Sequence, residues 1–335
     1  MNDSFYRDFE DCFRGTRGLI TSRLGVYLPF VRPLSTRDLP ARALDLGCGR
    51  GEWIELLGEN GFEAFGVDLD EGMLAACGER GLNAQKADAL GTLQALPAES
   101  VALVSAFHVV EHLPFDTVRA LVREALRVLE PGGLLILETP NPENLAVGAC
   151  SFYLDPSHQR PLPSALLGFV VQHAGFCRSK VLCLQEAAEL HGGTPIGLFS
   201  VLTGVSPDYA VVAQKNAAVD VLSRFDGSFD TAFGLSLATL AQRYDRQGED
   251  RAAQIEARLS SAESQADRRA AQADSRAVQV DDAMAQLAER LARLEGQLHA
   301  MLYSRSWRIT APLRWLAGVV RQIRQRVTKF FGGEQ

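Results

Sequence analysis

The sequence of this 335-residue chain predicts an α/β domain with a mostly parallel sheet, followed by a long helix and a basic amphipathic tail. Short apolar runs alternate with amphipathic stretches over residues 41–215, which is the pattern of strands and helices that follow one another along a chain. Over residues 246–303, apolar side chains recur at spacings of three and four, and no proline interrupts them. Residues 304–335 mix arginine with aromatic and aliphatic side chains.

Length and composition are those of a folded soluble protein. Apolar residues make up 47% of the chain and charged residues 22%, and 335 residues suit one large domain or two. The six cysteines show no C-x-x-C spacing, so we expect reduced thiols and a cytoplasmic location. No uninterrupted apolar run is long enough to predict a membrane-spanning helix, and the acidic start lacks the apolar core of a secretory signal.

The formal net charge of −7 hides an asymmetry between the body and the end of the chain. Residues 305–335 hold seven Lys or Arg and one acid, whereas the rest of the chain holds 27 basic and 40 acidic residues. An acidic body argues against a nucleic-acid partner, and a basic tail indicates contact with an anionic surface.

The order of elements follows from the hydrophobic pattern and the positions of proline and glycine. A helical leader is expected over residues 1–40, because its helix-like sequence ends in a group of prolines. The strands are expected at residues 43–47, 64–69, 86–89 (the end of a short third strand), 101–107, 133–140, 179–184 and 209–215. Helices are expected at residues 53–60, 73–80 and 115–130, and Pro131-Gly132-Gly133 stops the last of them. Residues 216–245 are then a linker, residues 246–303 a coiled coil and residues 304–335 the tail.

The strongest chemical signal is the turn after the first strand, where Gly47, Gly49 and Gly51 lead into a helix. Glycine allows a tight turn and the close approach of a ligand, and the helix N-terminus behind it offers free N–H groups. A dinucleotide loop reads G-x-G-x-x-G, whereas this loop reads G-x-G-x-G and follows the acid Asp45. A carboxylate there suits a cationic group, such as an α-amino group, better than a pyrophosphate.

Two further acids stand at the ends of the next strands. Asp68, followed by Leu69, ends the second strand, where an acid accepts hydrogen bonds from both hydroxyls of a ribose. Asp88, followed by Ala89, ends the third strand, where its carboxylate can accept from the exocyclic amine of adenine.

The glycine loop, the two acids and the Pro-Gly-Gly run resemble the class I S-adenosylmethionine-dependent methyltransferases over about residues 41–215. The resemblance implies a Rossmann-like sheet of seven strands in which the strand at residues 209–215 is inserted antiparallel. It also implies S-adenosyl-L-methionine as cofactor, in one pocket lined by Asp45, Gly47, Gly49, Gly51, Asp68, Leu69, Asp88, Ala89 and Phe107. The alternative is an α/β domain in which the glycines are coincidental.

Four titratable side chains are the candidate catalytic groups. His108, Glu111 and His112 follow the fourth strand, and His158 lies in the proline-rich loop after the fifth. They could supply a base for a hydroxyl acceptor, or ligands of the N/O type for a metal. Some ubiquinone-pathway and small-RNA methyltransferases carry a similar E-x-x-E-H run that binds a divalent ion, but His108 takes the first position here, so no metal is assigned. The alternative for Glu111 and His112 is a supporting role beneath the cofactor.

The acceptor is suggested by the loop at residues 151–163, the leader at residues 13–17 and the tail at residues 304–314. Together they resemble bacterial O-antigen chain-terminating and other surface-polysaccharide methyltransferases. Those enzymes methylate the end of a lipid-linked glycan, on a phosphate or a sugar hydroxyl, and stop its elongation. The resemblance implies a lipid-linked polysaccharide as acceptor, with Arg14, Arg17 and Arg160 as candidates to hold a phosphate or an anionic sugar.

The coiled-coil prediction rests on a seam of Met284, Leu287, Leu291, Leu294, Leu298 and Met301. A helix over residues 246–303 would be roughly 85 Å long, and a homo-oligomer is expected because a polar lone helix has little to stabilise it. The alternatives are a solvated single helix and a disordered linker. Leu316, Val320 and Ile323 of the tail alternate with arginines, which suits a helix lying on the inner-membrane surface, whereas the alternative is that the tail packs on a partner protein or caps the coil.

Two other functions remain open from the sequence. The first is an O-methyltransferase of a small molecule or of RNA, although the acidic body disfavours RNA and a diffusible substrate leaves the long helix and the tail without a purpose. The second is a non-enzymatic coiled-coil scaffold that recruits a glycosyltransferase. A peripheral position on the inner membrane, with the coil as a spacer, is the prediction that accounts for all segments.

Overall fold

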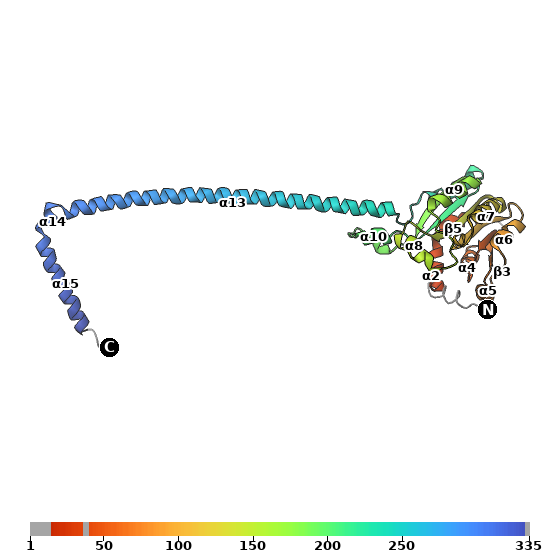
Figure 1. The fold of residues 1–335 in the computed structure, drawn as a ribbon, viewed down its shortest axis with the longest axis horizontal. Coiled ribbons are helices and arrows are strands. Elements are labelled where there is room, and N and C mark those ends of the chain that lie inside the picture. Colours follow the sequence, from red (N-terminus) through yellow and green to blue (C-terminus); the bar gives the residue numbers. More distant parts are fainter. Residues whose placement is uncertain (1–14, 36–39, 332–335) are drawn as a thin grey trace. The chain divides into compact units, whose positions relative to one another are not determined.

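The computed structural model describes residues 15–35 and 40–331, of which Figure 1 shows the ribbon. The chain divides into two compact units, Met1–Asp250 and Arg251–Gln335, and each is described by itself. Residues 1–14 and 36–39 of the predicted leader and residues 332–335 of the predicted tail lie outside the described residues.

The first unit is built on a seven-stranded sheet of order β3-β2-β1-β4-β5-β7-β6. Its strands are β1 (Ala41–Leu46), β2 (Phe62–Asp68), β3 (Ala84–Lys86), β4 (Val101–Phe107), β5 (Leu129–Pro140), β6 (Arg178–Leu184) and β7 (Asp208–Gln214). The pairs among β1, β2, β3, β4 and β5 are parallel, whereas β7 runs antiparallel to both β5 and β6. The predicted mostly parallel sheet with an inserted antiparallel strand is therefore confirmed.

The reversal of β7 decides which side chains meet at one edge of the sheet. The five strands from β1 to β5 are parallel, so their carboxyl ends lie at the same edge. Because β7 is antiparallel, its amino end lies at that edge too, and Asp208 is the register partner of Pro140. An acid that begins β7 thus joins the acids and histidines that end β4 and β5.

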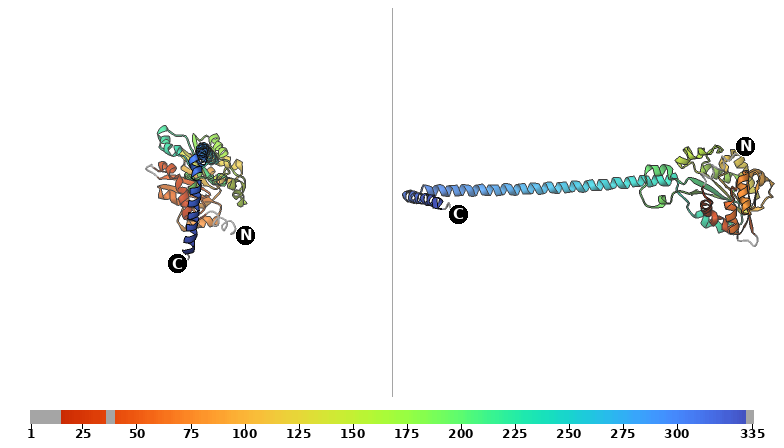
Figure 2. Two further views of the ribbon diagram at one scale, coloured as in Figure 1. Left: turned by 90° about the vertical axis from the view of Figure 1, so that its left-hand side faces the viewer. Right: turned by 90° about the horizontal axis from the view of Figure 1, so that it is seen from below.

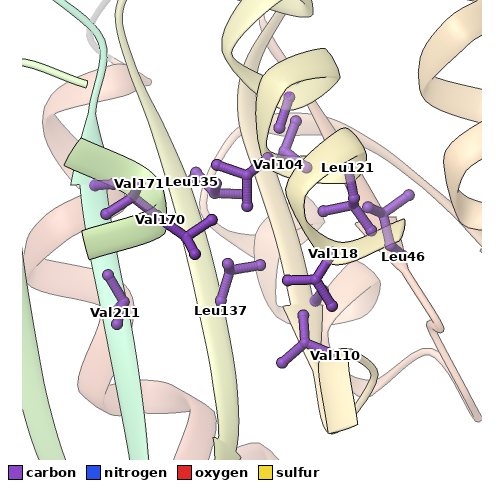
Figure 3. Close-up of a cluster of buried hydrophobic side chains, with 14 of the residues drawn as sticks. Leu46, Val104, Val110, Val118, Leu121, Leu135, Leu137, Val170, Val171 and Val211 are labelled. Atoms are coloured by element: carbon purple, nitrogen blue, oxygen red, sulfur yellow. The ribbon is translucent and has the colours of Figure 1, made fainter. Parts of the chain in front are cut away.

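Helices cover both faces of the sheet. On one face, α6 (Ala89–Ala95), α7 (Phe115–Val128) and α9 (Ser164–Ala174) pack against alternate strand residues such as Leu135 and Leu137. Figure 3 shows this cluster, with side chains of α7 and α9 next to those of β4, β5 and β7. The intervening residues Leu134 and Ile136 face the opposite layer, which contains α4 (Glu52–Glu59). Helix α5 (Glu71–Glu79) follows β2, and its Cys77 packs against Cys48 and Ile54 in a small separate cluster.

The leader is part of this opposite layer. It contains α2 (Arg17–Leu24), η1 (Gly25–Tyr27), α3 (Leu28–Val31) and η2 (Arg32–Leu34), and Tyr27 and Phe30 are fully buried. The Tyr27 ring lies 6.0 Å from Trp53 of α4 and 5.3 Å from Phe107 of β4, measured between ring centroids. The leader therefore brings side chains to the carboxyl edge of the sheet.

The segment at residues 216–245 corrects the prediction of a linker. It contains α11 (Val219–Leu222), η6 (Ser223–Phe225) and α12 (Asp226–Asp230), and Phe225 is buried against the sheet. Phe229 packs edge-on against Phe30 with a centroid distance of 5.6 Å. The physical reason is the spacing of three phenylalanines, 225, 229 and 233, whose burial is worth more than the freedom of a linker.

The remaining short helices lie in loops near the carboxyl edge or next to α13. They are η3 (Val110–His112), α8 (Leu145–Ala149), η4 (Ser151–Leu154), η5 (Ala188–His191) and α10 (Leu198–Thr203). Leu240 is fully buried with Ile196, Val201 and Val205, and Arg243 donates hydrogen bonds to the carbonyls of Leu190 and Gly192. These contacts explain why the long helix begins well before the predicted residue 246.

The long helix α13 (Leu237–Leu302) has 66 residues and is unbroken in Figures 1 and 2. It is followed by α14 (Arg305–Ile309) and α15 (Ala311–Phe331). Apolar side chains along α13 are exposed, with Leu287 at 57%, Leu291 at 58% and Leu294 at 57%. Within the described residues, the apolar stretches of every helix are too short or too interrupted by charge to cross a membrane.

Candidate active site

The glycine loop is held in a shape that side chains would obstruct. Gly47, Gly49 and Gly51 have φ angles of 69°, 53° and 77°, in the left-handed region. A Cβ on Gly47 would lie 2.4 Å from the Cγ2 atom of Val109. The N–H groups of Gly47 and Cys48 donate to the carbonyl of Val67, at 2.8 and 3.0 Å, and so fix the loop to the end of β2.

Asp68 joins the glycine loop to the next strand end. Its Oδ2 atom accepts a hydrogen bond from the N–H of Gly49 at 2.8 Å, and its Oδ1 atom accepts from the N–H of Asp70 at 2.9 Å. Each carboxylate oxygen has a second lone pair that can accept from a ribose hydroxyl. The side chain is thus oriented by the backbone before any ligand binds.

A cavity of about 260 Å³, the cofactor cavity, lies over this edge. The predicted cofactor residues that line it are Gly47, Gly49, Asp68, Leu69, Asp88, Ala89 and Phe107. Asp88 also caps α6, because its Oδ2 atom accepts from the N–H of Gly91 at 2.7 Å.

Gly51 lines neither of the two cavities described for this edge. A Cβ there would lie 2.6 Å from the Cδ1 atom of Leu82 and 2.9 Å from the sulfur of Cys77. Gly51 therefore packs closely at the start of α4, and its role as a cofactor contact stays a prediction.

A second cavity of about 370 Å³, the acceptor cavity, shares Gly47, Phe107, His108 and His112 with the first. Asp45 lines it, almost fully buried, and accepts a hydrogen bond from the hydroxyl of Ser105 at 2.7 Å. The leader contributes one wall. The two cavities therefore meet at these four shared residues.

His108 lies between three carboxylates. Its Nδ1 atom is 3.3 Å from Oε1 of Glu111, and its Nε2 atom is 3.4 Å from Oε1 of Glu138 and 4.0 Å from Oδ1 of Asp208. Burial disfavours the charged ring, but hydrogen bonding to Glu111 and Glu138 raises the pKa of His108 well above its ordinary value. The ring is therefore protonated near neutral pH, a form that donates hydrogen bonds, and its catalytic role stays a prediction. Its φ of 56°, unusual for histidine, shows how firmly it is held.

Glu111 is 1% exposed and lines neither cavity. Its Oε2 atom accepts a hydrogen bond from the hydroxyl of Thr139 at 2.9 Å. Burial alone would raise its pKa, but His108 lowers the pKa of Glu111 below its ordinary value, so the group is ionised. The position favours the supporting role that was the alternative in the sequence.

His112 and His158 come together in the acceptor cavity, with 4.6 Å between their ring centroids. The Nδ1 atom of His112 is 2.9 Å from the hydroxyl of Ser157, and the Nδ1 atom of His158 is 2.6 Å from the carbonyl of Phe152. Burial lowers the pKa of His112, so its ring is neutral at physiological pH and can accept a proton. Of the predicted catalytic groups, His112 is the one that lines both cavities in a form suited to a base.

Two groups of side chains could hold a divalent cation, although the sequence assigned none. In the described part of the chain, the ligand atoms of each group lie within 4.8 Å of one another: Glu111, His112 and His158 in the first, and His108, Glu138 and Asp208 in the second. The nitrogen and oxygen ligands of both are of the type that binds transition metals.

Sequence reasoning missed a group of polar residues in the acceptor cavity. Glu138, at the end of β5, accepts hydrogen bonds from the hydroxyl of Tyr27 and from Nε2 of Gln185, the latter at 3.1 Å. Burial raises the pKa of Asp208 to about 6. Arg23 of α2 completes this set. The signal that could have found Asp208 is the predicted reversal of the last strand, which places an acid before residue 209 at the carboxyl edge.

Comparison with known proteins agrees with this geometry. The profile of a methyltransferase-domain family matches residues 21–177. A probable S-adenosylmethionine-dependent methyltransferase of Mycolicibacterium smegmatis is 33% identical over 177 residues, which are 51% of this chain and 66% of that protein. A ubiquinone biosynthesis O-methyltransferase of Psychrobacter arcticus is 31% identical over 53% of this chain and 72% of its own length. The crystal structure of a SAM-dependent methyltransferase from Archaeoglobus fulgidus matches with 32% identity and a TM-score of 0.56, over 63% of this chain and 100% of that chain.

Proposed function

The chain belongs to the S-adenosylmethionine-dependent methyltransferases, and we propose that it transfers the methyl group of S-adenosylmethionine to the end of a lipid-linked surface polysaccharide. The observation that carries the acceptor is the combination, in one chain, of the methyltransferase sheet with α13 and the basic helix α15. A diffusible substrate gives no reason for these two helices, whereas a glycan that remains anchored in a membrane gives a reason for both.

The residues of the cofactor cavity fit this donor. The carboxylate of Asp68 is oriented to accept from the ribose hydroxyls, and Asp88 lines the same cavity where an adenine amine can donate. Asp45 lines the adjoining acceptor cavity, buried beside the glycine loop, and suits the amino group of the methionine part. When bound, the cofactor supplies a methyl group already activated by its positive sulfur. The protein positions the acceptor and assists removal of its proton.

The exposed seam of α13 supports self-association. At 1.5 Å per residue its 66 residues span about 99 Å. A stripe of half-exposed leucine and methionine on so long a helix is stabilised by a second copy, which buries it. We propose that the coil sets the distance between the membrane and the methyltransferase unit, and so influences the glycan length at which methylation occurs.

The end of the chain supports attachment to the inner-membrane surface. Leu313 and Trp315 of α15 are exposed, and Arg321, Arg324 and Arg326 lie on the same helix. Apolar burial among the lipid headgroups and attraction to anionic lipid add together for such a helix. The guanidinium of Arg314 stacks 3.6 Å from the centre of the Trp307 ring, and this contact orders the junction with α14.

The decisive experiment follows the methyl group. The full chain is incubated with labelled S-adenosylmethionine and membrane glycans from the source cells, and the label is located by mass spectrometry. Label at the end of a glycan supports the proposal, whereas label in glycan-free fractions overturns it. Calorimetry with S-adenosylhomocysteine tests the scaffold alternative, because a scaffold that recruits a glycosyltransferase need not bind it.

A second candidate acceptor is a small molecule with a hydroxyl group. The observation that favours it is the likeness to a protein named as a ubiquinone biosynthesis O-methyltransferase, at 31% identity. The same labelling experiment separates the two, since a small product partitions into organic solvent without glycan.

Shortening the coil is expected to shorten the glycan at which methylation occurs. Deleting two heptads within residues 275–302 removes about 21 Å of helix while it keeps the heptad register. The modal glycan length is read from a gel. A control variant replaces the same two heptads by others of equal length and equal seam residues, and it should leave the length unchanged. An unchanged modal length in the deletion variant contradicts a spacer role.

Reversing the charge of the tail is expected to release the protein from anionic vesicles. Replacing Arg321, Arg324 and Arg326 by glutamate should weaken binding to phosphatidylglycerol vesicles by about 100-fold or more, at about 1 kcal/mol for each basic residue. Flotation measures the bound fraction. A matched control replaces Arg268, Arg269 and Arg276 of α13, which are equally exposed. Equal loss in both variants, or none in either, argues for a protein partner instead.

A further inference from the structure

We propose that the acceptor atom is the oxygen of a sugar hydroxyl, not of a phosphate, and that Asp208 binds this hydroxyl through a hydrogen bond. The inference rests on the proposed function, since it takes the end of a glycan as the acceptor. It is carried by the charges and the shape of the acceptor cavity.

Acidic side chains dominate the acceptor cavity. Its described lining includes five carboxylates: Asp45, Glu52, Glu138, Asp155 and Asp208. Glu52 is paired with Arg50 at 3.0 Å, and Asp45 is the acid that suits the amino group of the donor. Against the other three carboxylates stand Arg23 and three histidines. A phosphate group carries up to two negative charges and would enter a partly buried site that is already negative, where repulsion is strong. A hydroxyl carries no charge, and carboxylates accept its hydrogen bond.

The described arginines that the sequence suggested as phosphate ligands interact with other residues. Arg17 pairs with Glu55 and donates to the carbonyl of Arg50 at 2.7 Å. Arg160 stacks over the Phe115 ring, 4.3 Å from its centre. Neither lines the acceptor cavity, and Arg14 lies outside the described residues.

Asp208 differs from the other lining carboxylates in its partners. Ser105 donates to Asp45, Tyr27 and Gln185 donate to Glu138, and Ser157 donates to Asp155. No described residue donates a hydrogen bond to the Asp208 side chain, and Nε2 of His108 lies 4.0 Å from its Oδ1 atom. The side chain is 16% exposed, so its oxygens reach the cavity. A partly buried carboxylate with unused lone pairs is a binding site for a donor from the acceptor.

The lining of the cavity also contains apolar side chains. Leu24, Trp53, Phe107 and Leu154 line it together with Ile20. A sugar ring has hydroxyl groups at its edge and C–H groups on its faces, so a cavity that offers both acids and apolar groups suits it. Binding sites of this kind combine an apolar lining with a few polar groups that fix orientation.

The chemistry balances with a hydroxyl acceptor. The hydroxyl oxygen forms a bond to the methyl carbon while the carbon–sulfur bond breaks, and the electron pair of that bond stays on sulfur as a neutral thioether. The hydroxyl proton is released to water. The product is a methyl ether.

The first test locates the methyl group in the glycan product. After labelling with the full chain, the glycan is hydrolysed in acid, which leaves a methyl ether on the sugar. Mass spectrometry should find the label on an O-methyl monosaccharide. Label on phosphorus, detected as a methyl phosphate by NMR, overturns the inference while it leaves the proposed function standing.

The second test does not depend on the glycan. Inorganic phosphate is titrated into the chain loaded with S-adenosylhomocysteine, and no binding is expected at 10 mM, an excess of about 10-fold over a millimolar site. Binding of phosphate that disappears in an Arg23→Gln variant overturns the inference. If no glycan carries the label, the proposed function is refuted. The phosphate titration would still show whether the acceptor cavity binds an anion.

A third test addresses Asp208 directly. Asp208→Asn is expected to lower kcat/KM for the labelled acceptor by about 100-fold while the affinity for S-adenosylhomocysteine changes less than about 2-fold. Glu189→Gln, an exposed acid in η5 outside the cavity, serves as the matched control. Equal activity of Asp208→Asn and the control, with the cofactor bound normally, contradicts the role of Asp208.

Discussion

Replacing Asp68 by alanine is expected to weaken the binding of S-adenosylhomocysteine by about 100-fold or more. The carboxylate accepts from the N–H groups of Gly49 and Asp70, and its remaining lone pairs face the cofactor cavity. Hydrogen bonds to a charged group contribute about 1.5–3 kcal/mol each, so the loss of two from a ribose reaches that factor. Removal of the two backbone bonds also frees the glycine loop, which adds to the effect.

Titration calorimetry on the full chain measures this loss, and two variants serve as controls. Asp68→Asn keeps an acceptor oxygen of the same shape without the charge, and about a 10-fold loss is expected. Glu71→Gln changes a neighbouring exposed acid that pairs with Lys86, and it should bind like the unaltered protein. If Asp68→Ala binds S-adenosylhomocysteine with unaltered affinity, the cofactor lies elsewhere and the proposed function loses its basis.

The fold could be predicted because each of its decisive signals is local. A glycine loop after an apolar strand, acids at the ends of the next two strands and a Pro-Gly-Gly turn stand in short stretches of sequence. These stretches include Gly47, Asp68 and Asp88, which line one cavity in the structure. The inserted strand at residues 209–215 was expected from the family resemblance, and the pairing of β7 with β5 and β6 confirms it.

The acceptor side could not be predicted in the same way, because its residues come from segments far apart in the chain. Arg23 and Tyr27 reach the cavity region only because the leader packs on the sheet, next to Trp53 and Phe107. Asp208 reaches it only because β7 is reversed. The predicted linker at residues 216–245 was wrong for a related reason. The spacing of Phe225, Phe229 and Phe233 gives no local sign of which surface they pack on, and Phe225 finds that surface only in the folded unit.

Replacing Glu111 by alanine is expected to lower the free energy of unfolding of the first unit by about 3–5 kcal/mol, the cost of breaking a buried ion pair by removing one partner. The ionised carboxylate pairs with His108 at 3.3 Å and accepts from Thr139 at 2.9 Å. Without it, the hydroxyl of Thr139 loses its partner, and Nδ1 of the protonated His108 loses the carboxylate that it faces. Urea unfolding followed by the fluorescence of buried Trp53, in a background with Trp307 and Trp315 replaced by phenylalanine, reports on this unit alone.

Two control variants separate the ion pair from general effects of substitution. Glu111→Gln keeps the volume and the acceptor for Thr139, so a smaller loss is expected than for Glu111→Ala. Glu124→Ala removes an acid that pairs with Arg127 at the surface of α7, and a change below about 1 kcal/mol is expected. Equal losses of unfolding free energy in the alanine variants at positions 111 and 124 would show that the buried ion pair stabilises the unit no more than a surface pair does.

The pH dependence of the difference in unfolding free energy between the unaltered protein and Glu111→Ala identifies the groups involved. The pKa of Glu111 lies below its ordinary 4.5 in the folded protein, so its stabilisation is present above that value and is lost as the pH falls through the folded pKa. The pKa of His108 lies above its ordinary 6.5, so its stabilisation is present below that value and is lost as the pH rises through the folded pKa. The difference in unfolding free energy between the unaltered protein and Glu111→Ala should therefore be largest between about pH 4.5 and 6.5. Measured in the presence of a chelator, a difference that stays constant from pH 4 to 9 would assign the loss to packing, because only an ionised pair follows these two pKa values.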